Sequence, residues 1–186
     1  MGYQDLKDEE LAKEIKAKNN QALAEIIGRY QNKLFYYVVR LIGNEEDAED
    51  VVQETFLKVY ENIQGFDENR KFSSWIYRIA HNLGINQIKK SQRLSAVEAH
   101  TLDWLEDRQE EAEDVIAQAE RGQLMQEMKE KIFALREDYR DILILYYFEE
   151  KSYEEISDIL HIPESTAGVW LRRARTNLKK IMLKQE

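Results

Sequence analysis

Apolar residues recur every three or four positions through most of the chain, which is the spacing of one buried face of an α-helix. The first such segment spans residues 21–42, and its apolar side chains are Leu23, Ile26, Ile27, Tyr30, Leu34, Tyr37, Val38 and Leu41. Gly43 then fits the left-handed residue that ends a helix, and Asn44 fits the N-cap of the next helix. The pattern therefore predicts a long helix that stops at residue 42.

Two further helices are predicted at short intervals after it. One covers residues 45–63, and the other begins with Ser73 or Ser74 as its N-cap. Trp75 in this third helix is interpreted as a core residue because it lies at helical spacing from other apolar positions. Helices with short connections pack into bundles, so residues 1–92 are predicted to form one helical domain.

The C-terminal part of the chain is predicted to form a second helical domain. Residues 93–120 lack a sustained apolar stripe and carry nine acidic residues against two basic ones, which indicates an acidic linker. Beyond it, Ser152 and Glu155 have the spacing of a capping box at the start of a short helix. Residues 121–186 then form the second domain, and the expected fold is all-α with two small helical domains joined by the linker.

Composition excludes several classes of protein. The 186 residues include one proline and no cysteine, so disulfides and thiolate metal sites are absent. The longest apolar run, residues 142–148, is much shorter than the roughly 20 residues of a membrane helix, so no membrane insertion and a cytoplasmic location are expected. The three histidines are isolated and no glycine-rich loop is present, so no catalytic residue, metal or cofactor is predicted.

Charge is segregated along the chain rather than mixed. The net charge is −9, yet residues 70–93 carry +6 with no acid and residues 164–186 carry +4, whereas residues 44–69 and 94–120 each carry −8. Phosphate repels an acidic surface and attracts a basic one. The blocks therefore predict two nucleic-acid surfaces and a separate protein-facing surface.

The last two predicted helices have the form of a helix-turn-helix. At 100° per residue, Ala167, Leu171, Ala174 and Leu178 form its buried stripe. The residues expected to contact duplex DNA are Ser165, Thr166, Val169, Arg172, Arg173, Arg175 and Thr176. The lysines nearer the C-terminus are equally well explained by the helix dipole.

The third helix and the loop before it combine cations, amides and aromatic rings, which suits single-stranded nucleic acid. The residues expected to bind a single strand are Phe66, Asn69, Arg70, Lys71, Phe72, Tyr77, Arg78, Asn82, Asn86 and Lys89, with His81 and Lys90 beside them. The preceding helix has a polar face that continues through Asp50, Gln53 and Glu54 beside Leu57, which suits a basic protein partner.

Three stretches in this order make the chain resemble the extracytoplasmic-function (group 4) sigma factors of bacterial RNA polymerase: residues 44–56, 72–82 and 152–175. The resemblance implies an alternative sigma factor, not an enzyme, that binds core polymerase and directs promoter recognition and DNA melting in transcription initiation. It implies that polymerase is bound by Asp47, Asp50, Gln53, Glu54 and Leu57. It implies that residues 66–72 and the third helix hold the single strand, that the helix-turn-helix reads the upstream duplex element, and that an anti-sigma factor regulates the protein.

One stretch departs from the family. Where the family has Lys or Arg, then Ser or Thr, then Arg near the start of the recognition helix, this chain has Gly168, Val169 and Trp170. Two alternatives to an ordinary sigma factor follow. One is a polymerase-binding protein with altered or lost reading of the upstream element, and the other is a stand-alone helix-turn-helix transcriptional regulator.

Overall fold

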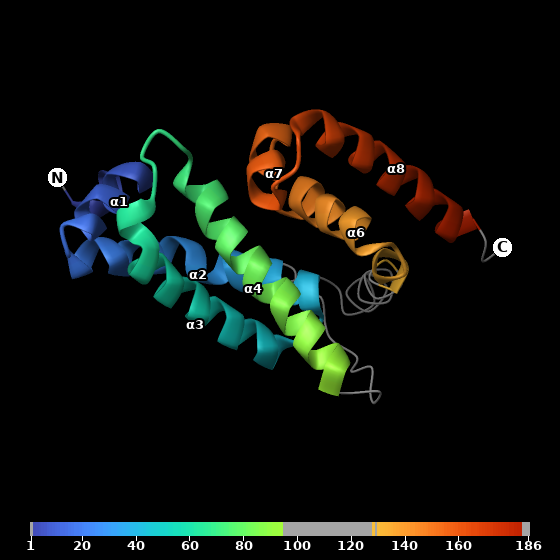
Figure 1. Cartoon of the computed structure of the whole chain (residues 1–186), viewed down its shortest axis with the longest axis horizontal. Helices are drawn as coiled ribbons and strands as arrows, with labels where there is room; N and C mark the ends of the chain where they lie inside the picture. The colour runs from blue at the N-terminus through green and yellow to red at the C-terminus, as the bar shows by residue number, and fades with distance from the viewer. Residues whose placement is uncertain (1, 95–127, 129, 184–186) are drawn as a thin grey trace, which may run out of the picture. The chain divides into compact units, whose positions relative to one another are not determined.

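The computed structural model describes residues 2–94, 128 and 130–183. All regular elements in these ranges are helical, which confirms the predicted all-α class. The chain divides into two compact units, one that contains helices α1 to α4 with residues Asp158–His161, and the other that contains α6, the first part of α7 and α8 (Figure 1). Almost all of the predicted linker, residues 93–120, lies outside the described residues. No helix in the described part of the chain has the length and apolarity needed to cross a lipid bilayer.

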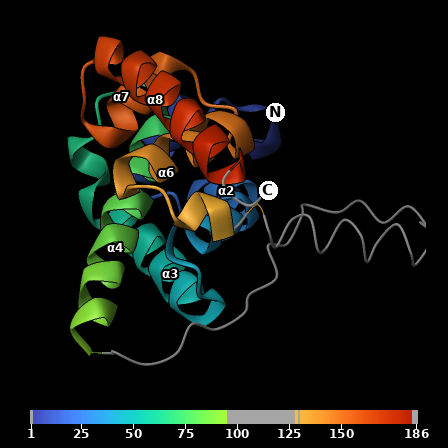
Figure 2. The same cartoon turned by 90° about the vertical axis from the view of Figure 1, so that its right-hand side faces the viewer.

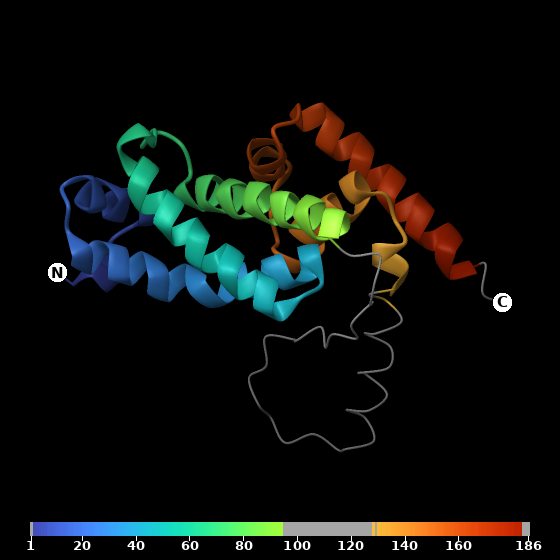
Figure 3. The same cartoon turned by 60° about the horizontal axis from the view of Figure 1, so that its bottom comes forward.

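The described helices of the first unit form a bundle around one core. They are α1 (Asp8–Lys16), α2 (Asn20–Ile42), α3 (Glu45–Asn62) and α4 (Phe72–Leu94), with a short 3₁₀ turn over Ile63–Gly65. Helices α2, α3 and α4 run alongside one another, and α1 lies at the end of the bundle where the chain passes from α3 to α4 (Figure 3). Leu34, Tyr37 and Ile76 are fully buried between them.

The boundary between α2 and α3 is the one predicted. Gly43 has a φ of 78°, a left-handed conformation that favours glycine, and its N–H donates to the carbonyl oxygen of Val39. The Asn44 side chain accepts a hydrogen bond of 2.8 Å from the backbone N–H of Asp47. Local sequence therefore determines where both helices begin and end.

The predicted start of α4 is wrong. The helix begins at Phe72, and Ser74 is buried with a hydroxyl that has no hydrogen-bond partner among the described residues. The N–H of Phe72 donates instead to the carboxylate of Glu9, 3.0 Å away on α1. Because α1 supplies this acceptor, the helix needs no local cap from Ser73 or Ser74.

The second unit contains α6 (Glu137–Leu143), most of α7 (Tyr153–Leu160) and α8 (Glu164–Leu183), and α6 packs on α8 (Figure 2). A π-helical turn over Ile144–Phe148 follows α6 and widens the helix there. Fully buried side chains from this unit include Ile142, Leu145 and Ile156.

Candidate functional site

Helix α3 presents an exposed face that is acidic around one large apolar residue. Its buried stripe includes Val51, Val52 and Val59, so the opposite side of the helix faces solvent. The exposed side chains there are Asp50, Gln53, Glu54 and Leu57, and Leu57 is 63% exposed. These residues lie within about two helical turns, so four of the five residues expected to bind polymerase share one surface, here called the α3 face.

Asp47, the fifth of these residues, is placed differently. Its side chain is half-buried, and one carboxylate oxygen accepts a hydrogen bond of 2.6 Å from the side-chain amide of Gln87 on α4. The Asp47 side chain therefore joins two helices of the bundle, while its backbone N–H donates to the N-cap Asn44.

A groove beside the α3 face was not predicted from the sequence. It has a volume of about 600 Å³ and is lined by residues of α2 and α3: Ile27, Gln31, Asn32, Phe35, Glu49, Val52, Gln53, Phe56 and Leu57. Tyr60, which is 47% exposed, also lies on α3. The sequence could have indicated that α2 contributes to this groove, because Phe35 falls outside the buried stripe of that helix.

The loop between α3 and α4 carries exposed polar side chains on a defined turn. The carboxylate of Asp67 accepts hydrogen bonds of 3.0 Å from the backbone and side-chain N–H groups of Asn69, and these bonds lower the pKa of Asp67. The N–H of Arg70 donates to the carbonyl oxygen of Asp67. Asn69, Arg70 and Lys71 are all exposed on this turn, here called the α3–α4 loop (residues 66–71).

Three aromatic residues expected to stack on bases are buried instead, so this part of the prediction is wrong. Phe66 and Phe72 are 4% and 0% exposed, and their rings meet edge to face at 5.4 Å. Tyr77 is 1% exposed and packs on Tyr37 at 5.1 Å. These rings add more to stability inside the bundle than they would at its surface. Trp75, predicted to be a core residue, is half-buried and contacts Phe66.

The polar residues predicted on α4 do line up. Arg78, Asn82, Asn86 and Lys89 are spaced by three or four residues, which places them on one side of the helix. Asn82, Asn86 and Lys89 are exposed and Arg78 is half-buried. His81, three residues after Arg78, is buried, and its Nδ1 is 3.0 Å from the hydroxyl of Tyr37. The loop and α4 therefore expose the predicted cations and amides, whereas the Phe and Tyr rings predicted to join them are buried.

The predicted helix-turn-helix is formed by α7 and α8. The capping box is present, since the Ser152 N–H donates to the Glu155 carboxylate and the Glu155 N–H donates to the Ser152 hydroxyl. Between the helices, His161 has a φ of 58°, and the hydroxyl of Ser157 donates to the carbonyl oxygen of Ile162. The Ser157 bond stabilises the short turn between the two helices.

Helix α8 divides into the two faces predicted from its sequence. Ala167, Leu171 and Ala174 are buried, whereas Leu178 is half-buried. The exposed side chains on the predicted DNA-facing side are Ser165, Val169, Arg172, Arg173 and Thr176, and Thr166 is half-buried. Arg172, Arg173 and Lys180 also line a shallow groove of about 530 Å³ against Tyr139 of α6. This surface is cationic and open.

Arg175 is exposed but is held by aromatic rings that sequence reasoning did not connect to it. Its guanidinium lies 5.5 Å from the ring centre of Tyr146 and 5.3 Å from that of Tyr147. Both tyrosines belong to the π-helical turn, and Tyr147 is 52% exposed. Cation–π attraction therefore fixes the direction of the Arg175 side chain.

Comparisons with known proteins agree with this arrangement. Residues 26–94 match the family model "Sigma-70 region 2", and residues 125–178 match "Sigma-70, region 4". The chain is 37% identical over 173 residues to the ECF RNA polymerase sigma factor SigW of Bacillus subtilis, covering 90% of this chain and 92% of that protein. It is 30% identical over 182 residues to the RNA polymerase sigma-H factor of Pseudomonas aeruginosa, covering 94% and 93%.

Solved structures share the fold. CnrH, solved in complex with the cytosolic domain of CnrY, has a TM-score of 0.71 at 20% identity and covers 96% of this chain and 99% of that one. The sigma factor RpoE, solved with the anti-sigma factor NepR from Bartonella quintana, has a TM-score of 0.66 at 22% identity and covers 86% and 95%. The chain therefore belongs to the extracytoplasmic-function sigma factors, the alternative sigma factors that bind core RNA polymerase and promoter DNA to initiate transcription.

Proposed function

We propose that this sigma factor divides its work among three surfaces. The α3 face binds the clamp coiled coil of the polymerase largest subunit, and the α3–α4 loop with the polar side of α4 holds the non-template strand of the opened promoter. Helix α8 reads the upstream promoter element as duplex. The connecting segment, residues 93–120, carries its negative charge into the path of the nascent RNA; almost all of it lies outside the described residues.

The exposure of Leu57 carries the assignment of the polymerase surface. A leucine side chain that is 63% exposed forgoes most of its burial free energy, about 2 kcal/mol for a complete burial. Its neighbours Asp50 and Glu54 are exposed carboxylates. An apolar centre within a charged rim is the composition of a protein interface, and the rim selects a basic partner.

The two DNA surfaces differ in the chemistry that they offer. The α3–α4 loop offers Asn69, Arg70 and Lys71, and an extended strand has phosphates and base edges for all of them. Helix α8 offers Arg172 and Arg173 to a duplex, and Val169, 39% exposed, is suited to a thymine methyl group. The difference supports a single-strand role for the first unit and a duplex role for the second.

The protein needs no catalytic group of its own in this scheme. The polymerase forms the phosphodiester bonds, and the sigma factor supplies recognition and strand separation in the cytoplasm, where the polymerase acts. CnrH was solved with the cytosolic domain of CnrY bound to it, and RpoE with the anti-sigma factor NepR. We assign a comparable anti-sigma partner to this chain, which would keep it from polymerase until a signal releases it.

Charge reversal on the α3 face tests the polymerase assignment. The variant Asp50→Lys/Glu54→Lys is expected to bind purified bacterial core polymerase at least about 100-fold more weakly, because two attractive contacts become repulsive. Fluorescence anisotropy of the labelled full-length chain measures this. Glu154→Lys, an exposed carboxylate at the start of α7, is the matched control and should bind core polymerase normally.

Leu57→Ala separates the apolar centre from the charged rim. Truncation is expected to weaken core binding about tenfold without changing its dependence on salt, since the side chain carries no charge. Normal core binding by both the charge-reversed chain and Leu57→Ala would refute the proposed polymerase surface.

A further inference from the structure

Helix α1 holds the beginning of the α3–α4 loop through Lys16, and Lys13 adds an ion pair of 3.3 Å with the carboxylate of Glu68. The Nζ of Lys16 donates to the carbonyl oxygen of Phe66 at 2.8 Å and to the carboxylate of Glu68 at 3.0 Å. This hydrogen bond lowers the pKa of Glu68, so the carboxylate stays ionised as a partner. The side-chain amide of Gln64 donates in turn to the backbone carbonyl of Lys16. Lys16 thus contacts both the backbone and a side chain of the loop.

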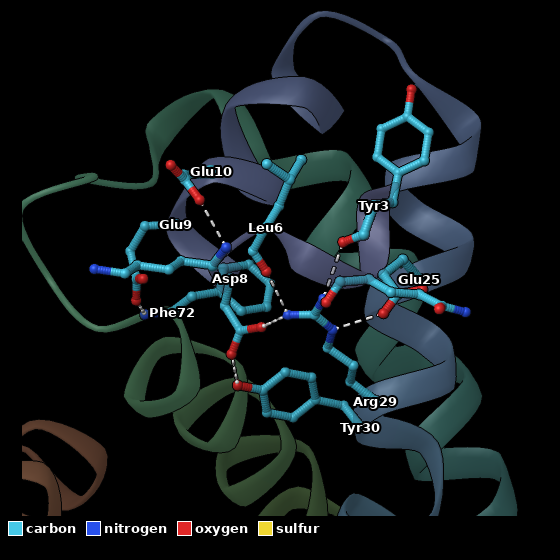
Figure 4. Close-up of polar contacts among 11 residues, drawn as sticks. Tyr3, Leu6, Asp8, Glu9, Glu10, Glu25, Arg29, Tyr30 and Phe72 are labelled. Carbon is cyan, nitrogen blue, oxygen red and sulfur yellow. Dashed lines mark hydrogen bonds and ion pairs between the residues drawn. The ribbon is translucent and has the colours of Figure 1, made fainter. Parts of the chain in front are cut away.

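The same helix holds the end of the loop. The carboxylate of Glu9 accepts the N–H of Phe72, the first residue of α4, at 3.0 Å (Figure 4). Lys71, which precedes α4, has only donors on its side chain and cannot cap the helix. The Phe72 ring also meets the ring of Tyr30 edge to face at 5.9 Å. The loop is therefore fixed at both ends by residues of α1, seven positions apart.

Helix α1 is itself tied firmly to α2. The guanidinium of Arg29 donates to the carboxylate of Asp8 at 2.8 Å and to the carbonyl oxygens of Tyr3 and Leu6 (Figure 4). The hydroxyl of Tyr30 donates to the other oxygen of Asp8, and burial together with this bond raises the pKa of Tyr30 well above its ordinary value. The tyrosine therefore remains a donor at every physiological pH.

Between the two fixed ends, the internal turn at Asp67 directs Asn69, Arg70 and Lys71 to solvent. We propose that Glu9 and Lys16 are positioning residues that hold the α3–α4 loop in its strand-binding conformation before DNA arrives. The inference rests on the proposed role of this loop in binding the non-template strand. Neither residue need touch DNA for the role, because Glu9 acts through the backbone N–H of Phe72 and Lys16 acts through the Phe66 carbonyl and the Glu68 carboxylate.

A loop that is held in place before binding should bind the single strand more tightly than a loop released at one end. A loop that must order itself on binding loses affinity for each side chain that it immobilises. Releasing one end of the loop should therefore weaken strand binding by about fivefold, the cost of ordering one or two side chains. Polymerase binding uses α3 and should be unaffected.

The experiment measures strand binding by holoenzyme assembled from full-length chain and bacterial core polymerase. The probe is a fluorescein-labelled single-stranded oligonucleotide with the non-template downstream element of a promoter selected by run-off transcription from a randomised library. Lys16→Met and Glu9→Leu should each weaken probe binding about fivefold. Glu9→Gln keeps an acceptor and should bind nearly as the parent does, and Lys179→Met, which removes an exposed lysine of α8, is the matched control.

A double-mutant cycle distinguishes positioning from loss of stability. A chain that carries Arg70→Ala/Lys71→Ala has already lost the two cations that the positioned loop offers to the strand. Adding Lys16→Met to this chain should therefore cause no further loss of probe binding. Glu68→Gln is a second variant that should also weaken probe binding. It should not prevent folding, because the Glu68 side chain is partly exposed. Circular dichroism and core binding verify that each chain is folded.

The outcomes separate this inference from the function on which it rests. Unchanged probe binding by Arg70→Ala/Lys71→Ala would refute the strand-binding role of the loop itself. Loss of binding in that variant with normal binding by Lys16→Met, Glu9→Leu and Glu68→Gln would overturn only the positioning role. Fully additive losses in the cycle would also overturn it, because they would show that Lys16 acts independently of the loop cations.

Discussion

Two glycines inside long helices should respond in opposite ways to the same substitution. A Cβ built on Gly28 of α2 meets nothing within 4 Å, whereas one on Gly84 of α4 comes to 2.8 Å from Cδ2 of the fully buried Leu41. Gly28→Ala should raise the free energy of unfolding by up to about 1 kcal/mol through helix propensity. Gly84→Ala should lower it by about 1 kcal/mol, because overpacking outweighs that gain. Urea unfolding of both chains checks the prediction, which shifts of the same sign would contradict.

The buried aromatic residues mark the limit of what sequence could establish about single side chains. Phe72 directly follows two basic residues and Phe66 opens the same loop, which is the pattern of a surface that stacks on bases. Their burial depends on Tyr30 and Trp75, one of which comes from a helix more than thirty residues earlier in the chain. By contrast, the exposed positions of α8 were predictable because its own periodicity determines which face is buried.

At the scale of elements, the sequence predicted the boundaries that local hydrogen bonds determine. The end of α2 at Gly43, the Asn44 cap and the Ser152 capping box all involve partners within four residues. The start of α4 depends on Glu9, which is 63 positions away, and no local signal could reveal it. The π-helical turn after α6 was missed because a wider turn leaves an apolar run looking like an ordinary helix.

Restoring the family's basic residues in the recognition helix α8 should strengthen its binding to DNA. A Cβ on Gly168 meets nothing within 4 Å, so a side chain can begin there without a clash. Gly168→Lys/Trp170→Arg should strengthen binding of the holoenzyme to a duplex upstream element, and it should steepen the slope of log affinity against log salt by up to about 0.9 for each phosphate gained. Filter binding over a salt series measures both quantities. An unchanged slope would exclude phosphate contacts at these positions, and Lys33→Met serves as the control for charge elsewhere.

On the scale of the whole molecule, the fold preserves the charge segregation of the sequence. The exposed acids of α3 lie on a different helix from the exposed cations of the α3–α4 loop and α4, and a further set of cations lies on α8 in the second unit. A net charge of −9 would repel DNA if it were spread evenly. Segregation lets one chain bind an anionic polymer and a protein partner through separate surfaces.

Separate cationic surfaces should produce separable defects. Arg172→Ala/Arg173→Ala should weaken holoenzyme binding to an upstream duplex and reduce its salt slope by about 1.8 if each arginine contacts one phosphate, while leaving single-strand binding unchanged. Arg70→Ala/Lys71→Ala should do the reverse and reduce the single-strand salt slope by about 1.4. Anisotropy titrations of both probes from 50 to 200 mM salt, roughly the range over which phosphate contacts dominate affinity, measure these slopes. If either variant weakened both probes equally, the two surfaces would act as one, and the division of labour between the units would be wrong.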